Sequence, residues 1–111
     1  MNYERGMKMI RDIILKKAME FDAEAVKEYN VEGKCGYADL FVIMTCNSPT
    51  KIKALTEKII FECKHSGNPV LGVEGVEEGE WCLLDFGDII VNIMTEEKRA
   101  LYKLEDIWEN M

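Results

Sequence analysis

The sequence predicts an α/β fold of the α+β type, a single domain over residues 1–111 in which helices flank a mixed sheet of about five strands. The chain has 111 residues, of which 48 % are apolar, enough for one packed core and too few residues for two domains. The predicted order is helix, two strands, helix, three strands and helix, so the two types alternate only in part. One continuous apolar run, residues 40–45, indicates a central strand covered on both faces.

Three segments carry apolar residues at helical spacing and predict helices, the first within residues 1–22. Ser48-Pro49 opens the second helix, because serine can cap free amides and proline is tolerated at the first helical position; Gly67 can end it. Thr95 is expected to cap a single C-terminal helix. The three apolar stripes are Met7, Ile10, Ile14 and Ala18; Ile52, Leu55, Ile59 and Cys63; and Leu101, Leu104 and Trp108.

Short runs of β-forming residues predict the strands. The first is weak, because Lys27 and Glu28 interrupt its apolar positions. Gly87-Asp88 is typical of a tight hairpin turn, and residues 75–79 form an acidic loop. The expected strands are residues 25–31, 40–45, 70–73, 81–86 and 89–94.

The charge balance is acidic and favours some partners over others. There are 14 Lys and Arg against 21 Asp and Glu, a net charge of −7. Binding to a nucleic-acid backbone needs clustered positive charge, so we expect little or no direct nucleic-acid binding. The negative surface either suits a basic protein partner or serves solubility alone. Charged residues interrupt the apolar positions near the N-terminus, which predicts no signal peptide and no membrane span, and hence a cytoplasmic protein.

The cysteine spacing predicts neither a metal site nor a redox site. No two cysteines have the C-x-x-C spacing, and His65 is the only histidine. We therefore expect free thiols in a reducing compartment, with no metal and no cofactor. The four cysteines are Cys35, Cys46, Cys63 and Cys82.

Three blocks of the sequence resemble the ribosomal silencing factors, the Iojap-like family. Residues 74–91 contain an E-G pair, then G-x-W and an L-D-aromatic-G-D stretch that leads into an aliphatic strand. Residues 38–43 resemble the family's A-D-aromatic-F-V-I, and residues 99–108 its R-x-x-Y-x-L-E-x-x-W ending. The resemblance covers residues 23–108. The chain departs from the family pattern at Asn92, Cys46 and Asn30, where histidine, glycine and aspartate are usual.

The resemblance implies both a fold and a function. The fold would be similar to that of nucleotidyltransferases, without enzymatic activity. The function would be translational repression: the protein would bind the large ribosomal subunit through its basic ribosomal protein fourteen and block association with the small subunit.

Residues 81–88 are the predicted partner-binding segment. Alternation places Trp81, Leu83 and Asp85 on one face, and Cys82, Leu84 and Phe86 on a wholly apolar core face. Tryptophan offers a large apolar face and an N–H donor, and is enriched among binding hot spots, although a core role is the alternative. Aspartate pairs with basic partners but commonly caps turns. The predicted partner-binding residues are Trp81, Leu83, Asp85, Phe86 and Asp88.

Four further residues are possible partner contacts. Glu74 and Glu78 belong to the acidic loop region, which could meet a basic ribosomal surface or be merely solvated. Arg99 and Tyr102 lie on the predicted C-terminal helix, where packing against the core, or an ion pair between Arg99 and Glu105, is the simpler interpretation.

Two other functions compete with this interpretation. A nucleotidyltransferase-like enzyme would bind nucleotide and magnesium near Ser48 and Asp39, although no second aspartate is suitably spaced. A homodimer would bury the Trp81 face of one copy against another, because exposed apolar patches often self-associate.

Overall fold

A five-stranded mixed sheet is the centre of the fold, with strand order β1-β2-β5-β4-β3. The computed structural model describes residues 2–110, so Met1 and Met111 of the predicted domain lie outside the described residues. The predicted α+β architecture is confirmed. The elements are α1 (Asn2–Glu20), β1 (Glu24–Asn30), β2 (Leu40–Thr45), α2 (Pro49–His65), β3 (Gly72–Glu74), β4 (Trp81–Asp85), β5 (Ile89–Met94), α3 (Glu96–Tyr102) and α4 (Leu104–Glu109).

The two central strands are parallel, and every residue in them is buried. β2 pairs with β5 in parallel, while β1, β4 and β3 are joined to the sheet by antiparallel pairs. Continuous apolar strands of this kind need cover on both faces. The prediction that residues 40–45 form a central strand is therefore confirmed.

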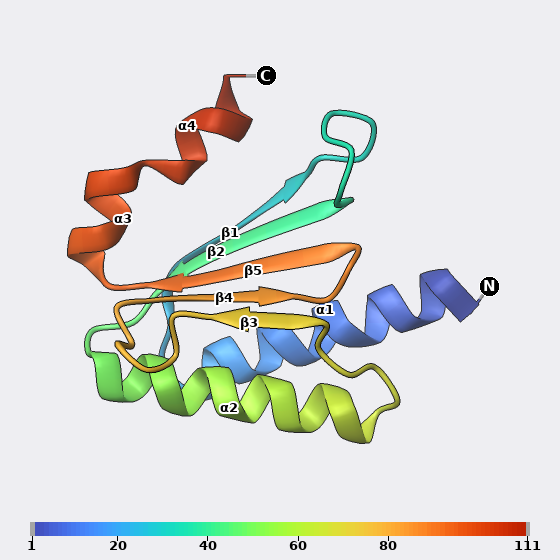
Figure 1. Cartoon of the computed structure of the whole chain (residues 1–111), viewed down its shortest axis with the longest axis horizontal. Helices are drawn as coiled ribbons and strands as arrows, with labels where there is room; N and C mark the ends of the chain where they lie inside the picture. The colour runs from blue at the N-terminus through green and yellow to red at the C-terminus, as the bar shows by residue number, and fades with distance from the viewer. Residues whose placement is uncertain (1, 111) are drawn as a thin grey trace.

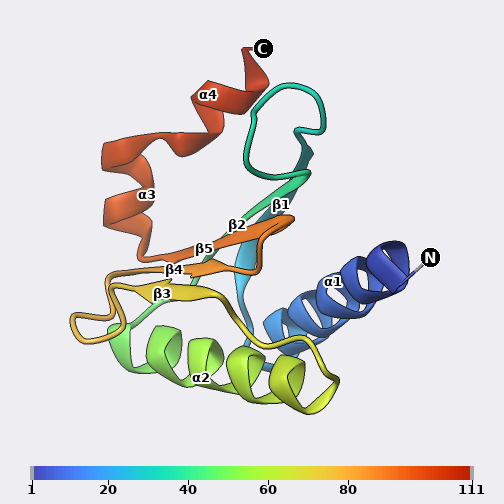
Figure 2. The ribbon, with the colours of Figure 1, turned by 45° about the vertical axis from the view of Figure 1, so that its right-hand side comes forward.

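Helices lie on both faces of the sheet, as Figures 1 and 2 show. α1 and α2 pack side by side on one face and enclose the larger core with the inward residues of β2, β4 and β5. α3 and α4 lie on the other face, where the Trp108 ring packs 4.9 Å from the ring of Phe41. Among the described residues, no helix is long and apolar enough to cross a membrane.

The C-terminal helix differs from its prediction. Lys103 adopts a left-handed conformation (φ 47°) and divides the segment into α3 and α4. The break changes the phase of the apolar spacing, so Leu101 is 68 % exposed instead of sharing a buried stripe with Trp108. The third strand also begins two residues later than expected, at Gly72. The predicted caps are confirmed: Ser48 Oγ and Thr95 Oγ1 accept hydrogen bonds from backbone amides in the first turns of α2 and α3.

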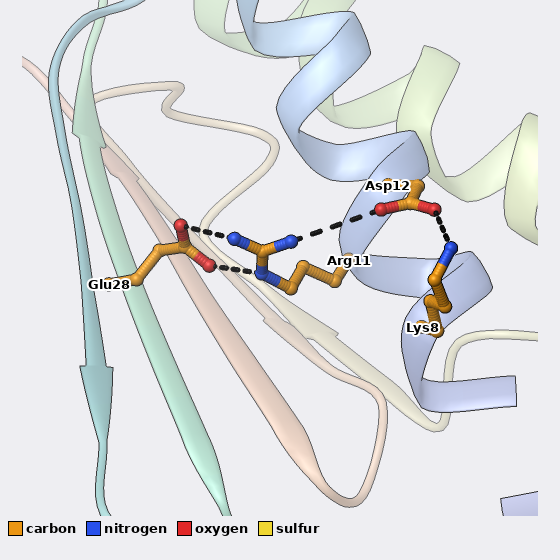
Figure 3. A network of polar contacts seen from close by, with 4 residues as sticks. All are labelled: Lys8, Arg11, Asp12 and Glu28. Carbon is orange, nitrogen blue, oxygen red and sulfur yellow. Dashed lines mark hydrogen bonds and ion pairs between the residues drawn. The ribbon is translucent and has the colours of Figure 1, made fainter. Parts of the chain in front are cut away.

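One ion pair fixes α1 against the edge strand. Arg11 donates from Nε and Nη2 to the two carboxylate oxygens of Glu28 on β1, at 2.6 and 3.0 Å. Figure 3 shows this pair together with the adjoining contacts of Asp12 and Lys8 along the helix. The bidentate geometry is favourable, but the site is solvent-accessible, so its contribution is roughly 0–1 kcal/mol.

The acidic loop is a closed turn held against the sheet. Gly79 N–H donates to the Gly75 carbonyl at 2.9 Å, and Val76 packs against the larger core. Gly75 has φ 84°, and a Cβ built there would lie 1.9 Å from the Trp81 carbonyl oxygen. Only glycine fits this position, so the loop conformation and the start of β4 depend on each other.

We expect Gly75→Ala to destabilise the fold more than a glycine replacement in open space. Gly33 has a similar φ of 78° but no atom within 4 Å of its built Cβ, so Gly33→Ala is the matched control. Backbone strain alone costs about 1–3 kcal/mol, and only the Gly75 variant adds a clash with backbone. Urea unfolding followed by circular dichroism measures both; equal losses would contradict the close approach.

Candidate functional site

The sheet face opposite α1 and α2 carries a half-buried patch on β4, at the edge of the smaller core. Trp81, Leu83 and Asp85 of β4 are each half-buried, while the alternating Cys82 and Leu84 are fully buried in the larger core. The predicted division of β4 into two faces is therefore confirmed.

Trp81 is held from two sides. Its indole Nε1–H donates to Asn92 Oδ1 at 2.8 Å, and its ring lies 4.8 Å from the ring of Tyr102 on α3, with the planes tilted by 44°. Asn92 is 1 % exposed, so this bond lies beneath the surface. The indole N–H is already used inside the chain, and Trp81 presents mainly its apolar ring to a partner.

Sequence reasoning missed the role of Asn92. It pairs with Leu83 and Ile43 in the sheet register, in the middle of the face that carries Trp81. A polar residue inside the otherwise apolar run of residues 89–94 was the available signal. Buried polar groups need hydrogen-bond partners, and the indole supplies one for the amide oxygen.

Tyr102 joins the patch, contrary to its expected core role. Its side chain is 49 % exposed, and it covers one side of Trp81. α3 contains no buried residue at all, so it rests on the sheet through contacts such as this one. We call Trp81, Leu83, Asp85, Glu74 and Tyr102 the Trp81 surface.

The acidic residues predicted around this patch lie at different places. Glu74 pairs with Leu83 in register, so it lies on the same face, and it is exposed. Glu78 lies in the closed acidic turn, beside Trp81 and Tyr102, and lines a small hollow there. Both are therefore at the rim of the aromatic pair, where charge is accessible.

Asp85 and Asp88 brace the hairpin turn between β4 and β5. Asp85 Oδ1 accepts from the Gly87 N–H at 2.7 Å, the turn-capping role named as the simpler alternative. The Asp88 carbonyl accepts from the amides of Asp39 and Leu40. Burial, and then the nearby Asp39 carboxylate, raise the pKa of the Asp88 carboxyl. Asp88 lines a hollow against α1, away from Trp81.

Phe86 is a correction to the predicted partner-binding set. Its side chain is 7 % exposed and lies in the larger core. The alternation of β4 continues to this residue, so it shares the buried face with Cys82 and Leu84. Phe86 therefore presents little surface to a partner.

Arg99 is an internal brace between three elements. Its Nε donates to Glu105 Oε2 at 2.9 Å, and its Nη1 donates to Thr45 Oγ1 at 3.0 Å. The expected ion pair with Glu105 is confirmed. Burial alone would raise the pKa of Glu105, but the hydrogen bond and charge of Arg99 bring it below its ordinary value. With its side chain 10 % exposed, Arg99 supports α3 and α4 rather than the surface.

The two residues named for a nucleotide site lie far apart. Asp39 precedes β2 and Ser48 follows it, so a strand of six residues separates them, about 20 Å at 3.3 Å per residue. The Ser48 hydroxyl caps α2 by accepting from the Lys51 amide. Within residues 2–110, no three His, Cys, Asp or Glu side chains are grouped as a metal site.

We expect Asn92→Leu to loosen Trp81 while leaving the fold intact. Leucine has the same branching as asparagine but cannot accept the indole hydrogen bond, whose net contribution is about 1 kcal/mol. Asn92 Nδ2 is buried and has no hydrogen-bond partner. Because the substitution also removes this unsatisfied donor, it offsets part of the lost stability. The readout is the Trp81 indole N–H signal in NMR spectra, with the Trp108 indole as internal reference. An unshifted, equally sharp Trp81 signal would contradict this account of the bond.

Comparison with known protein families and relatives identifies one family. The sequence model of the family described as "Ribosomal silencing factor during starvation" matches residues 7–111. Ribosomal silencing factor RsfS of Haemophilus influenzae is 34 % identical over 83 residues, 75 % of this chain and 81 % of that protein. RsfS of Bacillus subtilis is 33 % identical over 86 residues, 78 % of this chain and 73 % of that protein.

A eukaryotic relative and two solved structures extend the likeness. Mitochondrial assembly of ribosomal large subunit protein 1 of Mus musculus is 26 % identical over 93 % of this chain and 46 % of that protein. A crystal structure from Chromobacterium violaceum has a TM-score of 0.87 at 25 % identity, covering 92 % of this chain and 85 % of that one. One from Bacillus halodurans has a TM-score of 0.81 at 27 % identity, covering 91 % and 94 %. Because the family model matches nearly the whole chain and the fold is shared as well, this chain belongs to the ribosomal silencing factor family.

Proposed function

We propose that this protein represses translation in the cytoplasm by binding the large ribosomal subunit through its basic ribosomal protein fourteen. The bound protein prevents the small subunit from joining. Family membership supports the ribosomal role, and the Trp81 surface supplies a docking site for a protein partner. The observation that carries the proposal is the aromatic pair of half-buried Trp81 and exposed Tyr102 on the sheet face opposite α1 and α2.

The composition of the surface suits a basic protein. Hot spots are enriched in Trp and Tyr, and they lie inside a polar rim that excludes water. Here Glu78 lies beside the aromatic pair and Glu74 lies on the same face opposite Leu83, while Asp85 adds a carboxylate at the far end of β4. An acidic rim attracts basic partners and disfavours nucleic-acid phosphates, which agrees with the net charge of −7.

Steric exclusion requires only that the bound protein occupy space on the joining face of the large subunit; it requires no chemical reaction. The domain measures 39 × 34 × 22 Å, so a copy seated on the joining face of the large subunit would hold the subunits apart by at least its smallest dimension. No cofactor or catalytic group is needed for this action.

We expect Trp81→Ala to abolish or strongly weaken binding to the large subunit. Truncation of a hot-spot aromatic typically costs at least about 2 kcal/mol, a loss of roughly 30-fold in affinity. The measurement is co-sedimentation with isolated large and small subunits on sucrose gradients, followed by a subunit-joining assay.

The matched control is Phe61→Ala, which removes another exposed aromatic ring, 51 % exposed, from α2 on the opposite side of the sheet. It should bind like wild type. Wild-type protein that fails to sediment with the large subunit would overturn the function. Equal loss in both variants, or no loss in either, would place the docking surface elsewhere.

We expect the affinity for the large subunit to fall as salt rises. Exposed charges more than a Debye length apart are screened, and that length is about 10 Å at 0.1 M. The association rate should fall most, because charge steers encounter more than it holds the complex. Surface plasmon resonance over a salt series measures both rates; salt-independent association would contradict the electrostatic part of the proposal.

A homodimer is a second proposal for the same surface. The apolar rings of Trp81 and Tyr102 could be covered by another copy when no ribosome is present. Analytical ultracentrifugation of wild type and Trp81→Ala over a concentration range would reveal it. In that case self-association and ribosome binding would compete, because both use the Trp81 surface.

A further inference from the structure

A small hollow lies next to the aromatic pair, between the acidic turn and α3. Its volume is about 210 Å³, whereas pockets for drug-sized ligands start at about 300 Å³. This size suits one side chain rather than a small-molecule cofactor. The lining residues are Gly75, Glu78, Glu80, Trp81, Lys98 and Tyr102.

The hollow combines two aromatic rings with two carboxylates. Trp81 and Tyr102, whose rings lie 4.8 Å apart, line the hollow together with the exposed Glu78 and Glu80. Aromatic faces attract cations, and carboxylates accept hydrogen bonds from charged donors. The chain's own Lys98 shows this attraction, because its ammonium lies 5.9 Å from the centroid of the Tyr102 ring.

We propose that this hollow binds the guanidinium group of one arginine side chain from the basic partner. The identity of the partner rests on the proposed function, whereas the cation site itself is a property of this chain. A guanidinium is planar, stacks on aromatic rings and donates to carboxylates in a fixed fork, so it fits this lining better than an ammonium does. When the partner is absent, the Lys98 ammonium lies over the Tyr102 ring. The arginine of the partner displaces it on binding.

The walls of the hollow are fixed before any ligand arrives. Asn92 holds the Trp81 indole from below, and the close approach of Gly75 to the Trp81 carbonyl fixes the acidic turn against β4. Preorganisation of this kind reduces the entropy lost on binding. The Lys98 side chain, which is long and flexible, moves aside on binding.

The test uses N-acetylarginine amide as the probe and follows the Trp81 indole N–H by NMR. In wild type, the Trp81 signal should shift with millimolar probe while the Trp108 indole does not. Lys98→Gln removes the competing cation and should tighten binding about 2- to 5-fold, the range of an exposed cation–π contact. Tyr102→Leu should abolish the shift.

Two controls separate this site from general charge effects. Lys64→Gln makes the same charge change at an exposed position on α2, on the opposite side of the sheet, and should leave probe binding as in wild type. N-acetylglutamine amide has a similar shape but no charge and should not shift Trp81. Lys98→Gln is expected to fold normally, because Lys98 is half-exposed on α3.

The outcomes distinguish the hollow from the proposed function. The inference is overturned if Trp81 does not respond to the arginine probe even in Lys98→Gln, or if Lys64→Gln tightens binding equally. If either of these results is found but wild type still binds the large subunit, the inference about the hollow is wrong and the proposed function still holds. Conversely, a Trp81 response to the probe without binding to large subunits would support the cation site and overturn the function.

Discussion

The parallel pairing of β2 and β5 places two strands with no exposed residue at the centre of the sheet. Strands of this kind must be covered on both faces, and α1 and α2 supply one complete layer. The other face is covered mainly by α4, through Trp108 on Phe41. Cover on this second face extends only partly over β4, and the half-buried patch at Trp81 is the consequence.

The C-terminal segment therefore has two tasks. It completes the second core through Trp108, and it shapes the neighbouring surface through Tyr102. α3 has no buried residue, so its position depends on a few directed contacts, chiefly those of Arg99 with Thr45 and Glu105. The left-handed conformation of Lys103 changes the chain direction between α3, which carries Tyr102, and α4, which carries Trp108. A continuous helix could not have placed Tyr102 on Trp81 and Trp108 on Phe41 with the same phase.

The polar group within the buried face has a related role. Asn92 stands in an apolar strand, and its amide oxygen receives the Trp81 indole N–H. A ring fixed in this way presents an apolar face and a rigid wall to whatever docks. The acidic turn then places accessible negative charge beside it.

Much of this was determined by the sequence itself. The apolar run at residues 40–45, the caps at Ser48 and Thr95, and the alternation from residues 81 to 86 depend on local chemistry, and each prediction agrees with the structure. The family blocks are equally a property of the linear chain. Tertiary structure decided the rest. The break at Lys103, the contact of Tyr102 with Trp81 and the bond from Trp81 to Asn92 join residues whose proximity no spacing rule encodes. Side-chain alternation assigns a residue to a face, but only the packed helices decide which part of that face remains open.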